Sequence, residues 1–217
     1  MYNTVLFDLD GTLTDPGVGI TNSVMYALQK FGITVTDRSE LYCFIGPPLT
    51  DSFEKYYGFS KEQSLRALEL YREYFSVTGL YENEIYSGTV DMLEQLKAAG
   101  KKLILATSKP EKYAAEIIRY FKIDGYFDFV AGATMDEKRN KKADVIAWAV
   151  ESCGIKDLDT TVMVGDRNQD INGAKENGID SVGVLYGYGD IEELTCAGAT
   201  HIAKTTEDVV SIILNKE

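Results

Sequence analysis

Short apolar runs, rich in β-branched residues, recur along the chain. They have no alternating polar positions, a pattern that predicts strands buried on both faces of a sheet. Between the later runs, apolar residues recur at helical spacing, and most of these segments close at a glycine, which is a helix stop signal. The alternation predicts an α/β fold with a Rossmann-like parallel sheet and right-handed crossovers. The predicted strands are Thr4–Phe7, Lys102–Ala106, Phe127–Ala131, Thr161–Val164 and Ser181–Leu185, and the helices Val90–Ala99, Lys112–Phe121, Lys142–Cys153 and Asp170–Asn177.

The alternation is interrupted once, between about residues 16 and 87, where helical signals dominate and no strand pattern occurs. Ile20, Val24, Leu28 and Phe31 lie at helical spacing, as expected for an amphipathic helix. The sequence therefore predicts a core domain formed by residues 1–15 and 88–217 and a smaller helical domain, residues 16–87, inserted after the first strand. The insertion holds 8 of the 14 tyrosines, most of which we expect to pack with the hydroxyl at the surface.

Charge narrows the range of partners. The chain has 34 acidic and 22 basic residues and a formal charge of −12, the wrong sign for a nucleic-acid polymer or an anionic membrane surface. No apolar run is long enough to span a membrane, and no signal-peptide pattern occurs, so we expect a cytoplasmic protein. One histidine, His201, and three scattered cysteines argue against triad hydrolases and zinc sites.

Polar side chains follow four of the predicted strands. Asp8 and Asp10 stand in "FDLDGTLTD", Thr107 and Ser108 in "LATSKP", and Asp166 and Asp170 in "VMVGDRNQD", while lysines open a helix in "KRNKKADVI". Because the carboxyl ends of parallel strands meet at one edge of a sheet, these segments are expected to converge on one crevice. The set combines carboxylates, hydroxyls and an ammonium group.

These four motifs, in this order, resemble those of the haloacid dehalogenase superfamily. The likeness covers nearly the whole chain and is greatest to the branch of phosphoglycolate phosphatases and 5′-nucleotidases, which carry a small helical cap after the first motif. The resemblance implies a phosphatase that acts on a small phosphorylated metabolite through an aspartyl-phosphate intermediate. It is also compatible with a monomer or a weak homodimer.

The chemistry of phosphate esters agrees with this resemblance, because a site must supply a nucleophile, a proton carrier and charge neutralisation together. The resemblance implies Asp8 as the nucleophile and Asp10 as general acid and base. Gly11 allows the sharp backbone turn that brings both carboxylates to one phosphate and lines the phosphate site. Thr107 and Ser108 are expected to hold phosphate oxygens, helped by the N-terminus of the next helix.

A cation is needed between the anionic nucleophile and the phosphate, and Mg²⁺ suits oxygen ligands. The expected ligands are the Asp8 carboxylate, the Asp10 backbone carbonyl and the Asp166 carboxylate. Asp170 belongs to the same acidic set, and we expect it to orient a water or the lysine, with direct ligation left open. For the catalytic, phosphate-binding lysine, the form "KADVI" resembles one sub-branch of the family in which the lysine beside the alanine is the functional one, and this resemblance implies Lys142 and not Lys141.

Several alternatives remain at this point. A phosphomutase or pyrophosphatase of the same branch shares the core residues, and only the cap and a product assay separate them. A phospho-receiver domain is disfavoured because its phosphorylated aspartate ends a later strand. For substrates, the tyrosine-rich insertion favours a nucleoside 5′-monophosphate, whereas phosphoglycolate would want a cation such as Arg38, Lys55 or Arg72. Specificity is expected around Ile45–Leu49, where Gly46-Pro47-Pro48 predicts a rigid turn that begins a helix.

Overall fold

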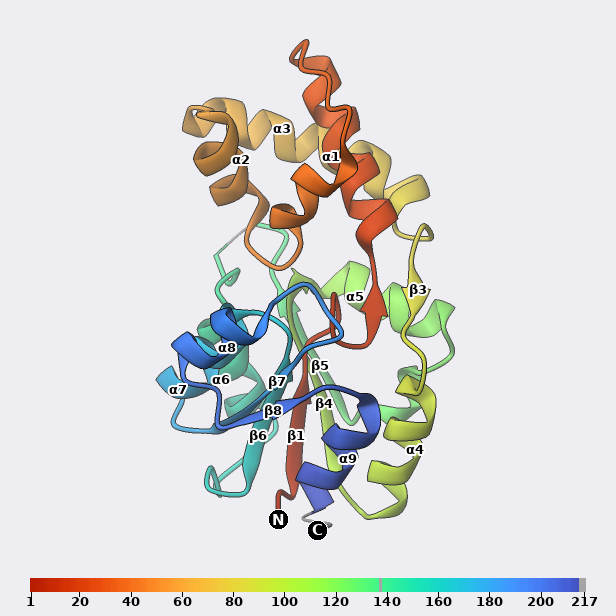
Figure 1. Ribbon diagram of the computed structural model, residues 1–217, viewed down its shortest axis with the longest axis vertical. Coiled ribbons are helices and arrows are strands. Elements are labelled where there is room, and N and C mark those ends of the chain that lie inside the picture. Colours follow the sequence, from red (N-terminus) through yellow and green to blue (C-terminus); the bar gives the residue numbers. More distant parts are fainter. Residues whose placement is uncertain (137, 215–217) are drawn as a thin grey trace. The chain divides into compact units, whose positions relative to one another are not determined.

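The structure, a computed structural model, describes residues 1–136 and 138–214. The chain divides into two compact units (Figure 1). The first, called the core unit here, comprises Met1–Thr14 and Ile85–Glu217, and the second, the cap unit, comprises Asp15–Glu84.

A six-stranded parallel sheet forms the centre of the core unit, in the order β5-β4-β1-β6-β7-β8. All five predicted strands are present, so the α/β expectation is confirmed. Both faces of the central strands are buried, since Val5, Leu6 and Phe7 of β1 have no exposed surface. The strands are β1 (Thr4–Phe7), β4 (Lys102–Pro110), β5 (Phe129–Ala133), β6 (Thr161–Gly165), β7 (Asp180–Val184) and β8 (His201–Ala203).

Helices cover the two faces of this sheet. Right-handed crossovers place α4, α5 and α9 on one face and α6, α7 and α8 on the other (Figure 1). Leu6, Ile104 and Met163 pack against Val145 and Ile146 of α6. The bounds are α4 (Thr89–Ala98), α5 (Glu111–Tyr120), α6 (Lys142–Ser152), α7 (Asn168–Glu176), α8 (Ile191–Ala197) and α9 (Thr206–Leu214), with a short 3₁₀ turn at Asp124–Tyr126.

The cap unit is helical, with an aromatic cluster in its core. Phe44 packs edge-on against Phe53, and Phe53 stacks on Phe59 at a centroid distance of 5.8 Å. The predicted Gly46-Pro47-Pro48 turn leads directly into α2. Ile45, the residue before this turn, is fully buried. The elements are α1 (Gly17–Lys30), a 3₁₀ segment (Arg38–Phe44), α2 (Leu49–Tyr57), α3 (Lys61–Tyr74) and a π-helical turn (Phe75–Gly79).

Two strands of two residues each, β2 (Thr14–Asp15) and β3 (Glu84–Ile85), pair where the chain enters and leaves the cap unit. The hydrophobic pattern did not predict them because two residues are too few to show a period. Among the described residues, no helix has the length and apolar character needed to cross a membrane.

Candidate active site

The loop after β1 brings the first two carboxylates to the carboxyl edge of the sheet. The amide of Asp8 still belongs to the sheet, since it donates to the Val164 carbonyl at 2.9 Å. The chain then turns, and the Leu9 carbonyl accepts from the amides of three of the following residues, Thr12, Leu13 and Thr14. Gly11 has a φ of +85°, and a Cβ there would lie 2.2 Å from Oδ2 of Asp166. This position therefore requires glycine both for its backbone conformation and for its closeness to Asp166.

Lys142, the first residue of α6, joins two of the carboxylates. Its Nζ lies 2.7 Å from Oδ1 of Asp8 and 2.8 Å from Oδ1 of Asp170, and it donates to the Ala106 carbonyl at 3.1 Å. All three charged side chains are buried. Lys141, by contrast, is exposed. Of the two lysines, Lys142 is thus the one that lies among the predicted site residues.

Asp166, just after β6, is held by neutral donors. Its carboxylate accepts from the Tyr188 amide at 2.8 Å and from the Thr12 hydroxyl at 3.3 Å. The loop after β7 that supplies the Tyr188 amide lies close against the site, because a Cβ on Gly187 would be 2.2 Å from the Gly11 carbonyl. Sequence reasoning did not assign this loop a role. The two glycines in "LYGYGD" were the available signal.

The end of β4 carries the predicted hydroxyl residues. Thr107 is buried and its hydroxyl accepts from the Lys109 amide at 3.2 Å, while Ser108 is partly exposed. Lys109 is also buried, and its Nζ lies 2.5 Å from Oδ2 of Asp10. Sequence reasoning noted Lys109 only as the residue that follows the hydroxyl pair.

Burial and mutual repulsion shift the pKa values in this cluster. Burial raises the pKa of Asp166 well above its usual range, and Asp170 and Asp8 raise it further. Burial also raises the pKa of Asp170, to about 6, although Lys142 opposes the shift. The pKa of Asp10 is raised by burial and partly restored by Lys109. Burial would lower the pKa of Lys142, but Asp170 and Asp8 outweigh it and raise that pKa. A carboxyl with a raised pKa is suited to carrying a proton near neutral pH.

The acidic cluster has the chemistry of a divalent metal site. Asp8, Asp166 and Asp170 each offer a carboxylate oxygen, and these oxygens lie within 4.8 Å of one another. Oδ1 of Asp10 is also buried without a hydrogen-bond partner among the described residues. Buried carboxylates at this spacing repel one another, and a hard cation with oxygen ligands would remove that cost. The residues present therefore fit Mg²⁺.

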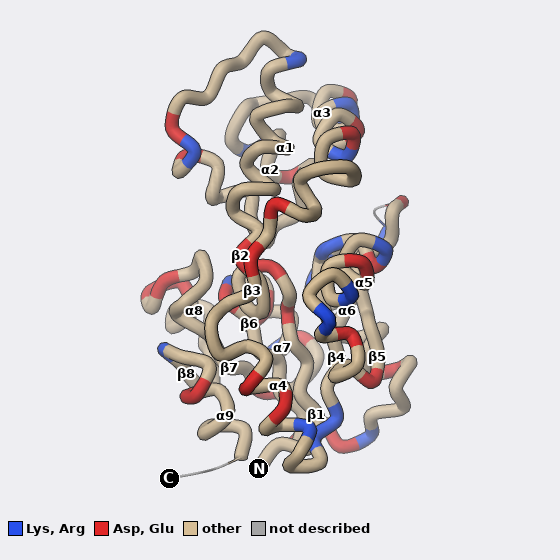
Figure 2. The backbone as a smooth tube through the Cα atoms, turned by 90° about the vertical axis from the view of Figure 1, so that its right-hand side faces the viewer, with Lys and Arg blue, Asp and Glu red and all other residues tan. Residues whose placement is uncertain are grey.

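The chain is acidic overall, and its basic residues include the two buried lysines of the site. Figure 2 shows acidic positions along both units, with basic positions beside α5 and α6. One of these helices begins at Lys142 and the other follows Lys109 closely.

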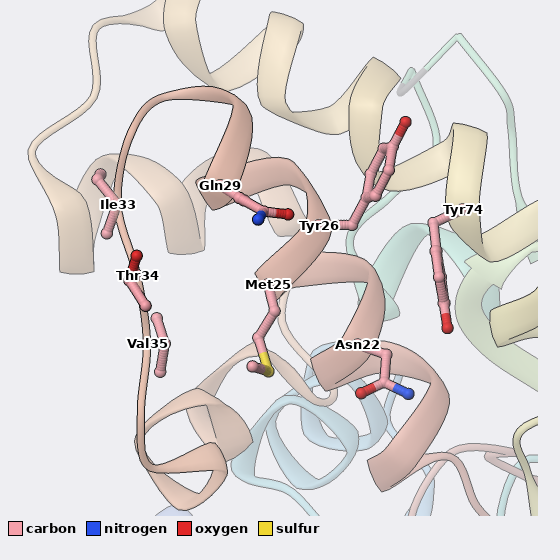
Figure 3. A pocket seen from close by; sticks show the side chains of 8 residues that line it. All are labelled: Asn22, Met25, Tyr26, Gln29, Ile33, Thr34, Val35 and Tyr74. Carbon is pink, nitrogen blue, oxygen red and sulfur yellow. The ribbon is translucent and has the colours of Figure 1, made fainter.

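The cap unit contains a separate pocket of about 370 Å³ beside α1 (Figure 3). It offers amides, hydroxyls and apolar groups, and no carboxylate lies among the residues that line it, so it cannot supply the acid and base chemistry of the core unit. Tyr26 and Tyr74, which belong to this lining, pack with their centroids 5.7 Å apart. The lining residues are Asn22, Met25, Tyr26, Gln29, Ile33, Thr34, Val35 and Tyr74.

Comparison with known proteins agrees with the geometry of the core unit. Residues 5–184 match the family of haloacid dehalogenase-like hydrolases. The chain belongs to this family. Among curated relatives of this hydrolase, a 5′-nucleotidase of Pseudomonas aeruginosa is 44% identical over 92% of the chain and 90% of its own length. A protein named tyrosine-protein kinase PtkA from Mycobacterium tuberculosis is 38% identical over 94% of the chain and 70% of its own length. A crystal structure of a predicted phosphatase from Clostridium acetobutylicum, 46% identical, superposes with a TM-score of 0.97 over 99% of both chains.

Proposed function

We propose that this hydrolase cleaves small phosphomonoesters with the help of Mg²⁺, through a phosphoenzyme formed on Asp8. The observation that carries the proposal is the Asp8–Lys142–Asp170 arrangement. The ion pair to Lys142 and the hydrogen bond from the Leu9 amide both use Oδ1 of Asp8. Among the described residues Oδ2 of Asp8 has no such partner, so this oxygen is the one we assign to attack.

The proposed reaction has two steps. In the first, an oxygen of Asp8 forms a bond to phosphorus, the bond from phosphorus to the leaving oxygen breaks, and Asp10 gives that oxygen its proton. In the second, Asp10 takes a proton from a water, which attacks the aspartyl phosphate, so that inorganic phosphate leaves and the Asp8 carboxylate is restored. Thr107, Ser108 and Gly11 line the phosphate position, and Lys142 contributes positive charge to it.

Mg²⁺, when bound, supplies neutralisation of the charge on the nucleophile and the phosphate. We assign it to the carboxylates of Asp8 and Asp166 and the backbone carbonyl of Asp10. Asp170 lies in the same cluster, and its ion pair with Lys142 favours a role in orienting that lysine. This division is supported by the partners of the two carboxylates: Asp170 pairs with Lys142, whereas the hydrogen bonds of Asp166 come from the neutral Tyr188 amide and Thr12 hydroxyl.

For the substrate we propose a nucleoside 5′-monophosphate, supported by the similarity to a 5′-nucleotidase over 92% of the chain. Phosphoglycolate would require a cap cation such as Arg38, Lys55 or Arg72, and two of these side chains have partners within the cap unit. The Arg38 guanidinium donates to Asn22 at 2.9 Å, and the Lys55 ammonium lies 5.0 Å from the centre of the Tyr56 ring. A phosphoglycolate phosphatase of Vibrio parahaemolyticus is 26% identical over 96% of the chain, so phosphoglycolate belongs in the substrate panel.

The experiment measures release of inorganic phosphate from a panel of nucleoside monophosphates, phosphoglycolate, pyrophosphate and p-nitrophenyl phosphate, with Mg²⁺ and with EDTA. We expect turnover only with Mg²⁺, and none in Asp8→Asn, which should fold normally. Asp159→Asn, an exposed carboxylate, is the matched control. Full activity in EDTA or in Asp8→Asn would refute the proposal. A sugar phosphate incubated in parallel tests the phosphomutase alternative, which predicts conversion to an isomer without release of inorganic phosphate.

The cap turn is tested with the same panel. We propose that residues 46–49 influence substrate choice, because Ile45 is buried in the cap core whereas these four positions are partly exposed. Pro47→Ala should change kcat/KM for some substrates more than for others, and Lys61→Ala, an exposed position on α3, should change none. An equal change for every substrate would leave the turn without a role in specificity.

A further inference from the structure

Two extra residues interrupt the pairing of β4 with β5 at the edge of the active site. The strands run in register up to Thr107, which lies opposite Gly132, and the next pair joins Pro110 to Ala133. Ser108 and Lys109 therefore form a bulge on β4. Bulges beside active sites change the direction of a side chain, and this one accompanies a buried lysine.

The Lys109 ammonium contacts the carboxylate of Asp10, which lies 99 positions away in sequence. The Nζ to Oδ2 distance is 2.5 Å, and the two side chains are only 5% and 11% exposed. A buried lysine is costly unless it is paired, and this contact compensates part of that cost. The hydrogen bond from the Lys109 amide to the Thr107 hydroxyl fixes the bulge at its base.

The two oxygens of Asp10 are unequal in this arrangement. Oδ2 is held by Lys109, whereas Oδ1 is buried without a hydrogen-bond partner among the described residues. Fixing one oxygen of a carboxylate fixes the direction of the other. Lys109 thus determines where Oδ1, the oxygen available for proton transfer, is presented.

We propose that Lys109 is a positioning residue for Asp10, an inference that rests on the proposed function of Asp10 as the proton carrier. The two buried lysines of the site divide the carboxylates between them: Lys142 pairs with Asp8 and Asp170, and Lys109 pairs with Asp10. Lys109 acts on the reaction through Asp10 and not as a ligand of the phosphate.

This role differs measurably from phosphate binding. A poor leaving group needs a proton as its bond to phosphorus breaks, whereas p-nitrophenolate leaves without one. Loss of a residue that acts through the proton carrier should therefore slow the reaction of a poor leaving group strongly and that of p-nitrophenyl phosphate only slightly. A phosphate ligand contributes equally to both substrates. The readout is kcat/KM, which reports the steps up to phosphoryl transfer.

The experiment compares Lys109→Met with the wild type on a nucleoside 5′-monophosphate and on p-nitrophenyl phosphate. We expect kcat/KM for the nucleotide to fall by about 10- to 100-fold, the usual effect of removing a supporting partner, and the loss on p-nitrophenyl phosphate to be much smaller. In the Asp10→Asn background, Lys109→Met should cause little further loss on the nucleotide, since the partner is already gone. Lys112→Met, at an exposed position of α5, is the control.

An equal loss on both substrates, or additive losses in the double variant, would overturn the inference. Lys109→Arg, which keeps the charge, should recover part of the nucleotide activity and serves as the second variant if Lys109→Met does not fold. Activity that survives Asp8→Asn would refute the proposed function, whereas the ratio between the two substrates tests Lys109 alone. If the wild type hydrolyses neither substrate, both proposals fail.

Discussion

Replacing Asp166 with asparagine should stabilise the metal-free protein while abolishing its activity. The side chain is fully buried, and its ligand oxygen lies within 4.8 Å of those of Asp8 and Asp170. Asparagine keeps the shape, can accept from the Tyr188 amide, and can donate to the Thr12 hydroxyl, which is both donor and acceptor. The substitution therefore removes a buried negative charge without removing the surrounding contacts.

The magnitude follows from the charges. Two unit charges 4.8 Å apart, the largest separation between these oxygens, repel by about 3.5 kcal/mol at an effective dielectric constant of 20. Lys142 offsets much of the charge on Asp8 and Asp170, so we expect a net gain of about 1–3 kcal/mol in the free energy of unfolding. For a chain of this size, each kcal/mol raises Tm by about 2–4 °C.

The pH dependence has a definite sign. Because the pKa of Asp166 is raised in the folded state, the folded protein binds more protons than the unfolded chain between the usual carboxyl pKa and the raised one. The stability of the metal-free wild type should therefore fall as the pH rises through that window. Asp166→Asn lacks this contribution, so the two proteins should differ most near neutral pH and converge as the pH is lowered.

The assay is thermal unfolding in EDTA and in Mg²⁺ at several pH values, with Asp159→Asn as the exposed control. We expect Asp166→Asn to have the higher Tm in EDTA near neutral pH, and only the wild type to gain substantially from Mg²⁺. A lower Tm for Asp166→Asn in EDTA, or an advantage that grows toward acidic pH, would refute the electrostatic reasoning. Equal stabilisation of both proteins by Mg²⁺ would remove Asp166 from the metal site.

Three further predictions concern single positions. Lys142→Ala should lower kcat by about 10²–10³-fold and destabilise the fold by about 3–5 kcal/mol, because it leaves buried carboxylates unpaired. Lys141→Ala should have neither effect. Steady-state kinetics and thermal unfolding measure both variants, and a larger effect at Lys141 would reverse the assignment. Gly187→Ala should raise the Mg²⁺ concentration that gives the half-maximal rate by about 10-fold or more. An unchanged concentration would show that this loop has no role in activation by Mg²⁺. Tyr2→Phe removes a hydrogen bond of 2.6 Å at the edge of the sheet opposite the candidate site. A denaturant titration should therefore show a free energy of unfolding lower by about 1 kcal/mol, with kcat/KM unchanged. A loss of activity would contradict this prediction.

The sequence predicted the architecture well because continuous apolar runs and glycine helix stops are strong, local signals. Thr4–Phe7 is a strand with the bounds predicted, and Lys142 opens its helix as predicted. Placement of the acidic motifs at strand ends needed only the rule for parallel sheets. Composition does not distinguish Lys141 from Lys142 as the lysine of the site, and the choice of Lys142 came from the resemblance.

Other features could not be predicted from the hydrophobic pattern because they depend on contacts between residues far apart in sequence. The Lys109–Asp10 pair requires a bulge, and a bulge leaves no mark in hydrophobic periodicity. The loop around Gly187 contacts Asp166 through the Tyr188 backbone amide, a donor that any residue type except proline can supply. Trp148 lies in a helix with apolar neighbours, yet it is 38% exposed, and the Arg139 guanidinium stacks over its ring at 4.7 Å.

The paired strands β2 and β3 bear on how this architecture diversifies. They pair with each other where the chain enters and leaves the cap, so the 70 residues from Asp15 to Glu84 are inserted between two paired segments. Loop-closure entropy grows only with the logarithm of insert length, and segments whose ends already meet are the ones that chains exchange or lengthen with least disturbance. A gene could therefore acquire a different cap between Thr14 and Ile85, and with it a different substrate, while every residue of the candidate site at the sheet edge was inherited unchanged.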